Sequence, residues 1–183
     1  MKKRVLILHG WGGSDFPHWQ SWLAGEIAKD YGCVSFLKFS DPDFPDKNRW
    51  KEELTKELDA FNPDIVICHS VANILWFHIC NETKPKELEN LFLVAPPSLT
   101  CDIKEIESFY PCKIPANFYA KESLLITSTN DPYITQEEVQ ELQKRLNIPI
   151  EVLENAGHIN ASSGYGEWPW ILQKIKISPN KRD

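Results

Sequence analysis

The chain has 183 residues, of which 42 % are hydrophobic and 25 % are charged, as is ordinary for one globular domain. That length is sufficient to bury a substantial core. The formal net charge of −6 argues against a nucleic-acid-binding protein, because such proteins carry a basic patch or stripe.

Residues 5–8 are the first apolar run, and they follow the basic residues 2–4 as in the start of a secretory signal peptide. The apolar stretch is too short for a signal peptide and ends at His9 and Gly10, so we interpret it as a first strand and the protein as cytoplasmic. Along the rest of the chain, no run approaches the roughly 20 apolar residues that span a bilayer, and we expect no membrane partner.

Six strand-like runs alternate with helix-like segments along the chain, which is the pattern of a parallel α/β sheet. Four of the runs are apolar on both faces, as strands that are covered by helices on both sides must be. The second and sixth runs are interrupted by polar residues, which suits edge strands. We therefore predict a three-layer α/β sandwich with a six-stranded, mostly parallel sheet of strand order 2-1-3-4-5-6. The runs are residues 5–8, 34–39, 65–68, 91–94, 124–126 and 150–153.

Apolar residues at helical spacing predict helices between these runs, and we interpret the stripes as core packing rather than as ligand contacts. The third of these helices opens with a capping box at residues 135–138. The stripes are Trp19, Trp22, Leu23 and Ile27; Trp50, Leu54, Leu58 and Phe61; and Val139, Leu142 and Leu146.

Residues 96–119 differ from the rest of the chain, because four prolines surround a short helical pattern. A crossover between parallel strands needs a dozen or more residues, so we expect this segment to combine a crossover with a small cap over the functional site. The predicted organisation is a single domain over residues 1–177, with the cap at about 96–119, followed by a C-terminal tail at 178–183.

The residues that follow the predicted strands carry the chemically reactive side chains. His9 and Gly10 follow the first strand, and Ser70 follows the third. Asp131 and His158 follow the fifth and sixth. Because ligands bind at the carboxyl ends of strands in open α/β sheets, we expect these residues to meet at one edge of the sheet.

Ser70 is the predicted nucleophile. A serine hydroxyl is a weak nucleophile until a base removes its proton during the attack. A nucleophilic serine often lies in G-x-S-x-G on a sharp strand-to-helix turn, and here Cys68 and Ala72 replace the two glycines. Both replacements are small, as the close approach of helix and strand requires. In the alternative interpretation, Ser70 is only the cap of a helix that starts near Val71.

His158 is the predicted base, because the pKa of histidine near neutrality suits both taking and returning a proton. Asp131 is the predicted partner that orients the imidazole and stabilises its protonated form. The alternatives are a loop histidine in a structural hydrogen bond and an ordinary Asn-Asp-Pro turn. The chain order Ser70, Asp131, His158 is the order found in α/β-hydrolases.

Two backbone amides are the predicted oxyanion hole, which stabilises negative charge as it develops on the substrate oxygen. They belong to Trp11, in a glycine-rich loop, and to Val71, at the start of a helix. A nucleotide-phosphate loop is the alternative for residues 9–13, but neither G-x-G-x-x-G nor Walker A spacing is present. The expected substrate-binding residues are His9, Gly10, Phe16, Pro97 and Trp168.

Several motifs together resemble the retinoblastoma-binding protein 9 family of small serine hydrolases, and the resemblance covers nearly the whole chain. Its most specific part runs from Gly-His-Ile-Asn at 157–160 to Gly-Tyr-Gly-Glu-Trp-Pro at 164–169. The resemblance implies a minimal α/β-hydrolase fold and serine hydrolase activity, with Ser70, Asp131 and His158 as the catalytic triad. The other matching segments are residues 9–14, 18–19, 68–70 and 130–133.

We therefore expect a serine hydrolase that cleaves a small ester, thioester or amide through an acyl-Ser70 intermediate, with a small molecule or short peptide as the acyl substrate. We expect no cofactor and no metal, because the histidines form no convergent ligand cluster in the sequence. The five cysteines are odd in number and lack a close CxxC pair, which favours reduced thiols.

Two alternative functions are compatible with the same residues. The first is a non-catalytic, protein-binding protein with this fold, which the departures from the family pattern at Cys68 and Ala72 favour. The retained triad order and the glycine-rich first loop oppose it, since an unused site need not keep them. The second is an acyltransferase, in which a group other than water accepts the acyl group. The sequence names no protein partner.

Overall fold

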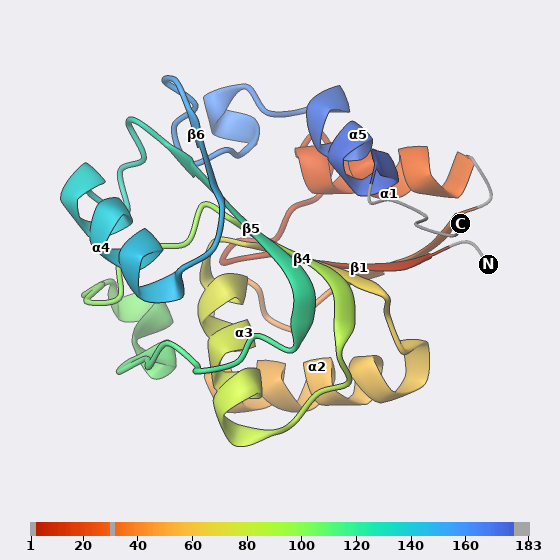
Figure 1. The fold of residues 1–183 in the computed structure, drawn as a ribbon, viewed down its shortest axis with the longest axis horizontal. Coiled ribbons are helices and arrows are strands. Elements are labelled where there is room, and N and C mark those ends of the chain that lie inside the picture. Colours follow the sequence, from red (N-terminus) through yellow and green to blue (C-terminus); the bar gives the residue numbers. More distant parts are fainter. Residues whose placement is uncertain (1–2, 30–31, 178–183) are drawn as a thin grey trace.

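Residues 3–29 and 32–177 are described by the structure, a computed structural model of the chain (Figure 1). Its six strands form one all-parallel sheet of order β2-β1-β3-β4-β5-β6, which confirms the predicted α/β class and strand order. The C-terminal tail predicted at 178–183 lies outside the described residues. The strands are β1 (Arg4–Leu8), β2 (Cys33–Leu37), β3 (Ile65–His69), β4 (Leu88–Val94), β5 (Ala120–Ser128) and β6 (Ile150–Leu153).

Helices cover both faces of the sheet, which gives the three layers of the predicted sandwich (Figure 1). One face is covered by α1 (Trp19–Lys29) and α5 (Pro169–Ile177). The other face is covered by α2 (Lys47–Phe61), α3 (Val71–Glu82) and α4 (Gln136–Leu146). No helix in the described part of the chain has the length and apolar character that crossing a bilayer requires.

The two faces of the sheet carry separate hydrophobic cores, because successive side chains of a strand point in opposite directions. In β1, Val5 and Ile7 pack in the core beneath α1 and α5. Leu6 and Leu8 of the same strand pack in the core beneath α2, α3 and α4. Each fully buried aliphatic side chain contributes about 1.5–3 kcal/mol to folding, so both cores hold the sheet and its edges in place.

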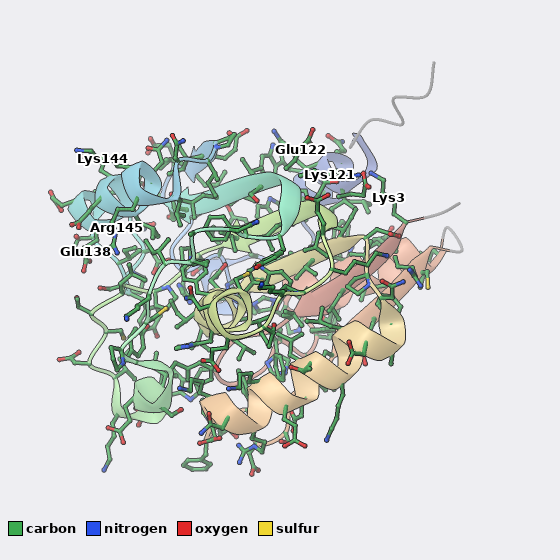
Figure 2. The ribbon with its side chains drawn as sticks, turned by 60° about the horizontal axis from the view of Figure 1, so that its bottom comes forward. Lys3, Lys121, Glu122, Glu138, Lys144 and Arg145 are labelled. Carbon is green, nitrogen blue, oxygen red and sulfur yellow. The ribbon has the colours of Figure 1, made fainter. Side chains whose placement is uncertain are left out.

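Three strands differ from the prediction by more than one residue at an end: β4 begins at Leu88 rather than at residue 91, and β5 and β2 differ as well. β5 begins at Ala120 rather than at residue 124, and it pairs with β4 from that residue on. The hydrophobic pattern misses this start because Lys121 and Glu122 are exposed (Figure 2). β2 ends at Leu37 rather than at residue 39, because the Phe39 amide donates to a histidine side chain instead of to a strand. The hydrophobic pattern therefore locates the buried part of a strand more accurately than its ends.

Capping groups fix where the helices begin and end. At the start of α2, Asp46 accepts a hydrogen bond from the amide of Arg49 (2.9 Å). At the start of α4, Thr135 and Glu138 form the capping box that the sequence predicts. Both helices end at an asparagine in the left-handed conformation. A cap of this kind stabilises a helix by about 1 kcal/mol.

The segment between β4 and β5 contains a short 3₁₀ helix, η1 (Lys104–Phe109), which belongs to the cap predicted at 96–119. Phe109 is fully buried and packs against Trp50 of α2, with ring centroids 5.6 Å apart. The Phe109 carbonyl accepts a hydrogen bond from His78 Nε2 of α3 (2.8 Å). The segment is thus anchored to α2 and α3.

Candidate active site

Ser70 lies in the sharp turn between β3 and α3. Its backbone has φ 56° and ψ −131°, a conformation that costs a residue with a Cβ atom about 1–3 kcal/mol. The side chain makes no cap hydrogen bond to α3, which contradicts the interpretation of Ser70 as a helix cap. The hydroxyl group is therefore available for another partner at the carboxyl edge of the sheet.

Hydrogen bonds to two carbonyl groups hold the Ser70 turn in this conformation. The Ser70 amide donates to the carbonyl of Val94 at the end of β4 (3.0 Å). The buried side chain of Asn73 donates from Nδ2 to the carbonyls of Ser70 (2.7 Å) and Val94 (2.9 Å). Each of these hydrogen bonds is worth about 1 kcal/mol, so together they offset the backbone strain.

The space that the turn needs comes from Gly10 as well as from the small residues beside Ser70. A Cβ atom on Gly10 would lie 2.6 Å from the Ser70 Cβ and 3.0 Å from its Oγ, closer than such atoms pack. Cys68 and Ala72, which replace the glycines of G-x-S-x-G, are fully buried in the core. Glycine is thus required at Gly10, in the loop after β1.

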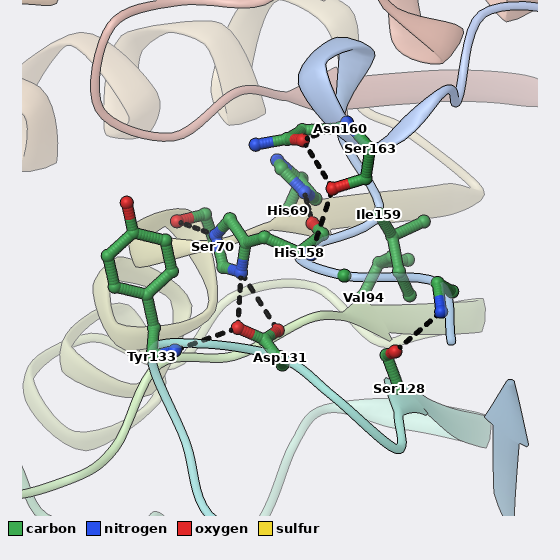
Figure 3. Close-up of polar contacts among 12 residues, drawn as sticks. His69, Ser70, Val94, Ser128, Asp131, Tyr133, His158, Ile159, Asn160 and Ser163 are labelled. Atoms are coloured by element: carbon green, nitrogen blue, oxygen red, sulfur yellow. Dashed lines mark hydrogen bonds and ion pairs between the residues drawn. The ribbon is translucent and has the colours of Figure 1, made fainter. Parts of the chain in front are cut away.

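Ser70, His158 and Asp131 form a continuous series of hydrogen bonds (Figure 3). His158 Nε2 lies 2.9 Å from Ser70 Oγ, and His158 Nδ1 lies 3.0 and 2.8 Å from the two carboxylate oxygens of Asp131. Since a carboxylate only accepts, Nδ1 carries the proton and Nε2 accepts from the Ser70 hydroxyl. The structure therefore brings together the three side chains that the sequence analysis selected, with His158 and Asp131 buried.

Hydrogen bonds tie the loop after β6, which carries His158, to the loop after β5. The Ala156 amide donates to Ser128 Oγ (2.9 Å), and the Gly157 amide donates to Asn130 Oδ1 (2.7 Å). The bonded residues of the two pairs lie 28 and 27 positions apart in the sequence, respectively. The two hydrogen bonds fix the distance between the imidazole and the carboxylate that orients it.

His69 and His18 are neutral imidazoles near His158. The ring of His69 packs against that of His158, with centroids 5.2 Å apart, and the ring of His18 packs against that of His69, with centroids 5.0 Å apart. His69 Nε2 donates to the His158 carbonyl oxygen (3.0 Å). Burial holds the pKa of His69 well below its ordinary value, and burial together with the nearby His158 lowers the pKa of His18 to about 4. Within residues 3–29 and 32–177, no three His, Cys, Asp or Glu side chains are placed to hold a metal ion. At neutral pH neither ring therefore adds positive charge near His158.

The backbone amides of Trp11 and Val71 donate no hydrogen bond to another described residue. The loop that carries Trp11 is fixed by hydrogen bonds from the Gly12 amide to the Pro42 carbonyl (2.8 Å) and from Trp11 Nε1 to the Asp43 carbonyl (3.1 Å). Val71 is the first residue of α3, where the helix dipole favours negative charge. Both predicted oxyanion-hole donors are therefore available to an oxygen atom.

A cavity of about 190 Å³ lies beside Ser70 and His158. Of the predicted substrate-binding residues, Pro97, which lies between β4 and β5, lines this cavity. Gly10 lies directly against the Ser70 side chain instead. Trp11, whose amide is a candidate oxyanion donor, also lines the cavity.

Besides Gly10, three predicted substrate-binding residues do not line this cavity. His9 is buried, and its Nε2 accepts a hydrogen bond from the Phe39 amide (3.0 Å), so it joins the loops after β1 and β2. Phe16 is 84 % exposed and extends into solvent. Trp168 is buried beside α1, where it packs edge-on against Trp19 with ring centroids 5.1 Å apart. These residues lie outside the cavity walls, because proximity to a motif in sequence does not determine side-chain direction.

Tyr133 and Asn160 line the cavity, although the sequence analysis assigned no role to either. The ring of Tyr133 contacts His158 edge-on, with centroids 4.5 Å apart. Each residue lies two positions after a member of the hydrogen-bonded series, Asp131 or His158. Because the loops are short, a residue two positions after Asp131 or His158 can be expected to lie near the cavity.

A family model described as serine hydrolase matches residues 5–176 of the chain. No curated protein sequence matches the chain. Among solved structures, the chain is similar to the ydeN gene product of B. subtilis, with TM-score 0.83 and 18 % identity, over 97 % of this chain and 98 % of that chain. It is also similar to the esterase domain of a Rhodothermus marinus protein, with TM-score 0.63 and 11 % identity, over 96 % and 85 %.

A third similar structure is the esterase Pf2001 of Pyrococcus furiosus, with TM-score 0.59 and 16 % identity, over 97 % of this chain and 82 % of that chain. At these low identities, the structural likeness shows a shared fold. The family model covers nearly the whole chain, including the segments that carry Ser70, Asp131 and His158. The chain therefore belongs to the serine hydrolase family.

Proposed function

We propose that the protein cleaves a small ester, thioester or amide through an acyl intermediate on Ser70. The observation that carries the proposal is the series of hydrogen bonds from Ser70 Oγ to His158 (2.9 Å) and from His158 to Asp131 (2.8 Å) beside a cavity. A serine, a base and a carboxylate in this order form an activated nucleophile. The strained Ser70 turn supports catalysis over binding alone, since a purely binding surface does not need it.

In the acylation step, Ser70 Oγ attacks the carbonyl carbon of the substrate while His158 Nε2 accepts the hydroxyl proton. The electron pair of the carbonyl double bond moves onto oxygen and gives a tetrahedral intermediate. When the intermediate collapses, the bond to the leaving group breaks and His158 returns the proton to that group. The acyl group then remains attached to Ser70.

In the deacylation step, a water molecule attacks the acyl carbon and gives a proton to His158 Nε2. Collapse of the second tetrahedral intermediate releases the carboxylic acid, and the proton returns to Ser70 Oγ. Asp131 stabilises the imidazolium in both steps through its hydrogen bonds to Nδ1. The same three side chains thus act in both halves of the reaction.

The oxyanion of both intermediates is assigned to the backbone amides of Trp11 and Val71. These amides are available, and they come from a loop and a helix start that the fold holds in place. One donor of this kind contributes about 10²–10³ in rate, because it is aimed at charge that develops in the transition state.

The cavity supports a short acyl group. Its volume is about 190 Å³, and Ile103, Ile106 and Tyr133 give it apolar walls. A long acyl chain would extend beyond these walls into solvent, where it gains little from burial. We therefore propose small acyl groups as the substrate class.

Two narrower assignments belong to the same proposal. The resemblance to the retinoblastoma-binding protein 9 family is supported by the loop 157–160, whose His158 and Asn160 both line the cavity. A cytoplasmic location is supported by the cysteines, all of which are unpaired, since disulfides are rare in that compartment.

Labelling with a fluorophosphonate probe, which reacts with activated serines, tests the proposal. We expect the wild-type protein to be labelled and Ser70→Ala to be unlabelled. Ser123→Ala is the matched control, because Ser123 lies toward the amino end of β5, away from the cavity, and we expect it to label like wild type. No labelling of the wild type, or equal labelling of Ser70→Ala, would overturn the proposal.

A further inference from the structure

Two of the polar side chains that line the cavity, and that the proposed hydrolysis does not use, belong to His18 and Asn160. His18 precedes α1, and Asn160 lies in the loop after β6. In each of them, one polar atom is occupied by a hydrogen bond from a backbone amide behind it. That bond determines which polar atom of the side chain is left to form a hydrogen bond with a ligand in the cavity.

In Asn160, the side-chain oxygen is held by the following residues. Oδ1 accepts hydrogen bonds from the Ser163 amide (3.0 Å), from Ser163 Oγ (2.9 Å) and from Ser162 Oγ (2.8 Å). Because a backbone N–H can only donate, the atom facing Ser163 must be the oxygen. The Nδ2 group is turned away from Ser163 and makes no hydrogen bond to another described residue (Figure 3). Asn160 therefore presents N–H donors to the cavity that it lines.

In His18, the ring nitrogen Nδ1 accepts a hydrogen bond from the Gln20 amide (3.2 Å). The pKa of His18 is lowered to about 4 by burial and by the nearby His158 and His9, so the ring is neutral at pH 7. A neutral ring whose Nδ1 accepts must carry its proton on Nε2. No other described residue is hydrogen-bonded to that Nε2–H, and the ring is only 5 % exposed.

We propose that His18 and Asn160 form a two-donor subsite that binds a second, uncharged carbonyl oxygen of the substrate. The cavity lining includes no Lys, Arg, Asp or Glu among the described residues, which favours a neutral acceptor over a carboxylate. The hydrogen bonds from the Gln20 and Ser163 amides fix both side chains, so their remaining N–H groups are held in place for an acceptor. This inference rests on the proposed hydrolase function and adds a substrate class to it.

Two pairs of esters test the subsite, and the members of each pair differ by one ketone oxygen. In the acyl pair, p-nitrophenyl 4-oxopentanoate is compared with p-nitrophenyl pentanoate. In the leaving-group pair, 4-oxopentyl acetate is compared with pentyl acetate. Each kcat/KM is divided by the rate of hydrolysis in buffer alone, which removes the intrinsic difference between the esters. We expect a preference for the oxo ester of about tenfold in one of the pairs, as two hydrogen bonds provide.

Variants assign that preference to the two donors. Asn160→Asp keeps an oxygen for the Ser163 amide and replaces the cavity-facing NH₂ with an oxygen, so we expect the preference to disappear or reverse. His18→Phe removes the second donor, and we expect it to reduce the preference several-fold. The added charge of Asn160→Asp acts on both esters of a pair alike, so the ratio within the pair isolates the hydrogen bond.

The outcomes separate this inference from the proposed function. Hydrolysis of all four esters without a preference in either pair overturns the subsite and leaves the hydrolase in place. A preference that Asn160→Asp leaves unchanged also overturns the subsite, and this variant retains the acceptor that holds its loop. Failure to hydrolyse any of the four, together with absent fluorophosphonate labelling, overturns the hydrolase itself.

Discussion

Gly10 packs directly against Ser70, and a Cβ atom on Gly10 would lie 2.6 Å from the Ser70 Cβ. The two residues belong to the loops after β1 and β3, which are neighbouring strands in the sheet. The nucleophile turn is therefore fitted against a neighbouring loop as well as against its own helix. That relationship explains how Cys68 and Ala72 can replace the usual glycines without crowding the turn.

Gly10→Ala should impair both catalysis and folding. The added methyl group must displace Ser70 Oγ or the Trp11 loop, and a displacement of about 1 Å costs about 10²-fold in rate. The expected result is a fall of kcat of that size, measured with p-nitrophenyl acetate, and a loss of about 1–3 kcal/mol in the free energy of unfolding.

Gly25→Ala is the matched control for Gly10→Ala. Gly25 lies in α1 with open space around its Cα, so a Cβ atom there meets nothing. Alanine in a helix interior stabilises by about 0.5–1 kcal/mol relative to glycine. We expect unchanged kcat and slightly higher stability, whereas a similar loss of kcat in both variants would contradict a special role for Gly10.

Asn73→Ala should release the strained turn at Ser70. The substitution removes the donor to the Ser70 and Val94 carbonyls and leaves both carbonyls with fewer partners. We expect a loss of about 1–3 kcal/mol in the free energy of unfolding, measured by urea denaturation, and a lower kcat. Asn81 is an exposed residue of α3 whose side-chain Nδ2 donates to the Lys113 carbonyl. We expect Asn81→Ala to change the free energy of unfolding and kcat only slightly.

The buried histidines should make the fold sensitive to mild acid. His18 has a pKa of about 4 in the folded state and about 6.5 when unfolded. Between these values the unfolded state binds a proton that the folded state does not, so the free energy of unfolding falls as pH falls. The slope contributed by His18 is at most about 1.4 kcal/mol per pH unit.

Urea denaturation of wild type and His18→Gln at pH 7.5 and pH 5 measures this contribution. We expect His18→Gln to lose less stability than wild type between the two values, because glutamine does not titrate. His69 and His9 contribute to the remaining loss, because burial also lowers the pKa of each of them. Equal losses in the two proteins would show that the pKa of His18 is the same in the folded and unfolded states, and would contradict its lowering by burial.

Tyr133 and Phe16 should differ in their effect on substrate turnover. Tyr133 lines the cavity and contacts His158, so Tyr133→Ala should lower kcat/KM by about tenfold or more through loss of packing. Phe16 is 84 % exposed and does not line the cavity, so Phe16→Ala should leave kcat/KM unchanged. A larger effect at Phe16 than at Tyr133 would contradict the assignment of the cavity walls.

The sheet and its reactive edge could be predicted from sequence, because buried strands carry a strong hydrophobic pattern and their carboxyl ends share one edge. The convergence of Ser70, Asp131 and His158 follows from that topology. The exposed start of β5 could not be predicted, since Lys121 and Glu122 give no burial signal.

Side-chain direction within the loops could not be predicted either. Trp168 and Phe16 lie near the motifs in sequence, but one packs beside α1 and the other extends into solvent. The tight contact between Gly10 and Ser70 depends on the spacing of two neighbouring strands, which a one-dimensional pattern does not contain. The donors of His18 and Asn160 depend in the same way on hydrogen bonds made behind each side chain.

The most direct test of the central claim is the hydrolysis of p-nitrophenyl acetate by Ser70→Ala, His158→Ala and the double variant. If the two side chains act as one unit, each single variant should lower kcat by about 10³-fold or more, and the double variant should be no slower than the single variants. Losses that multiply in the double variant, or a His158→Ala variant as active as wild type, would contradict a reaction in which His158 activates Ser70.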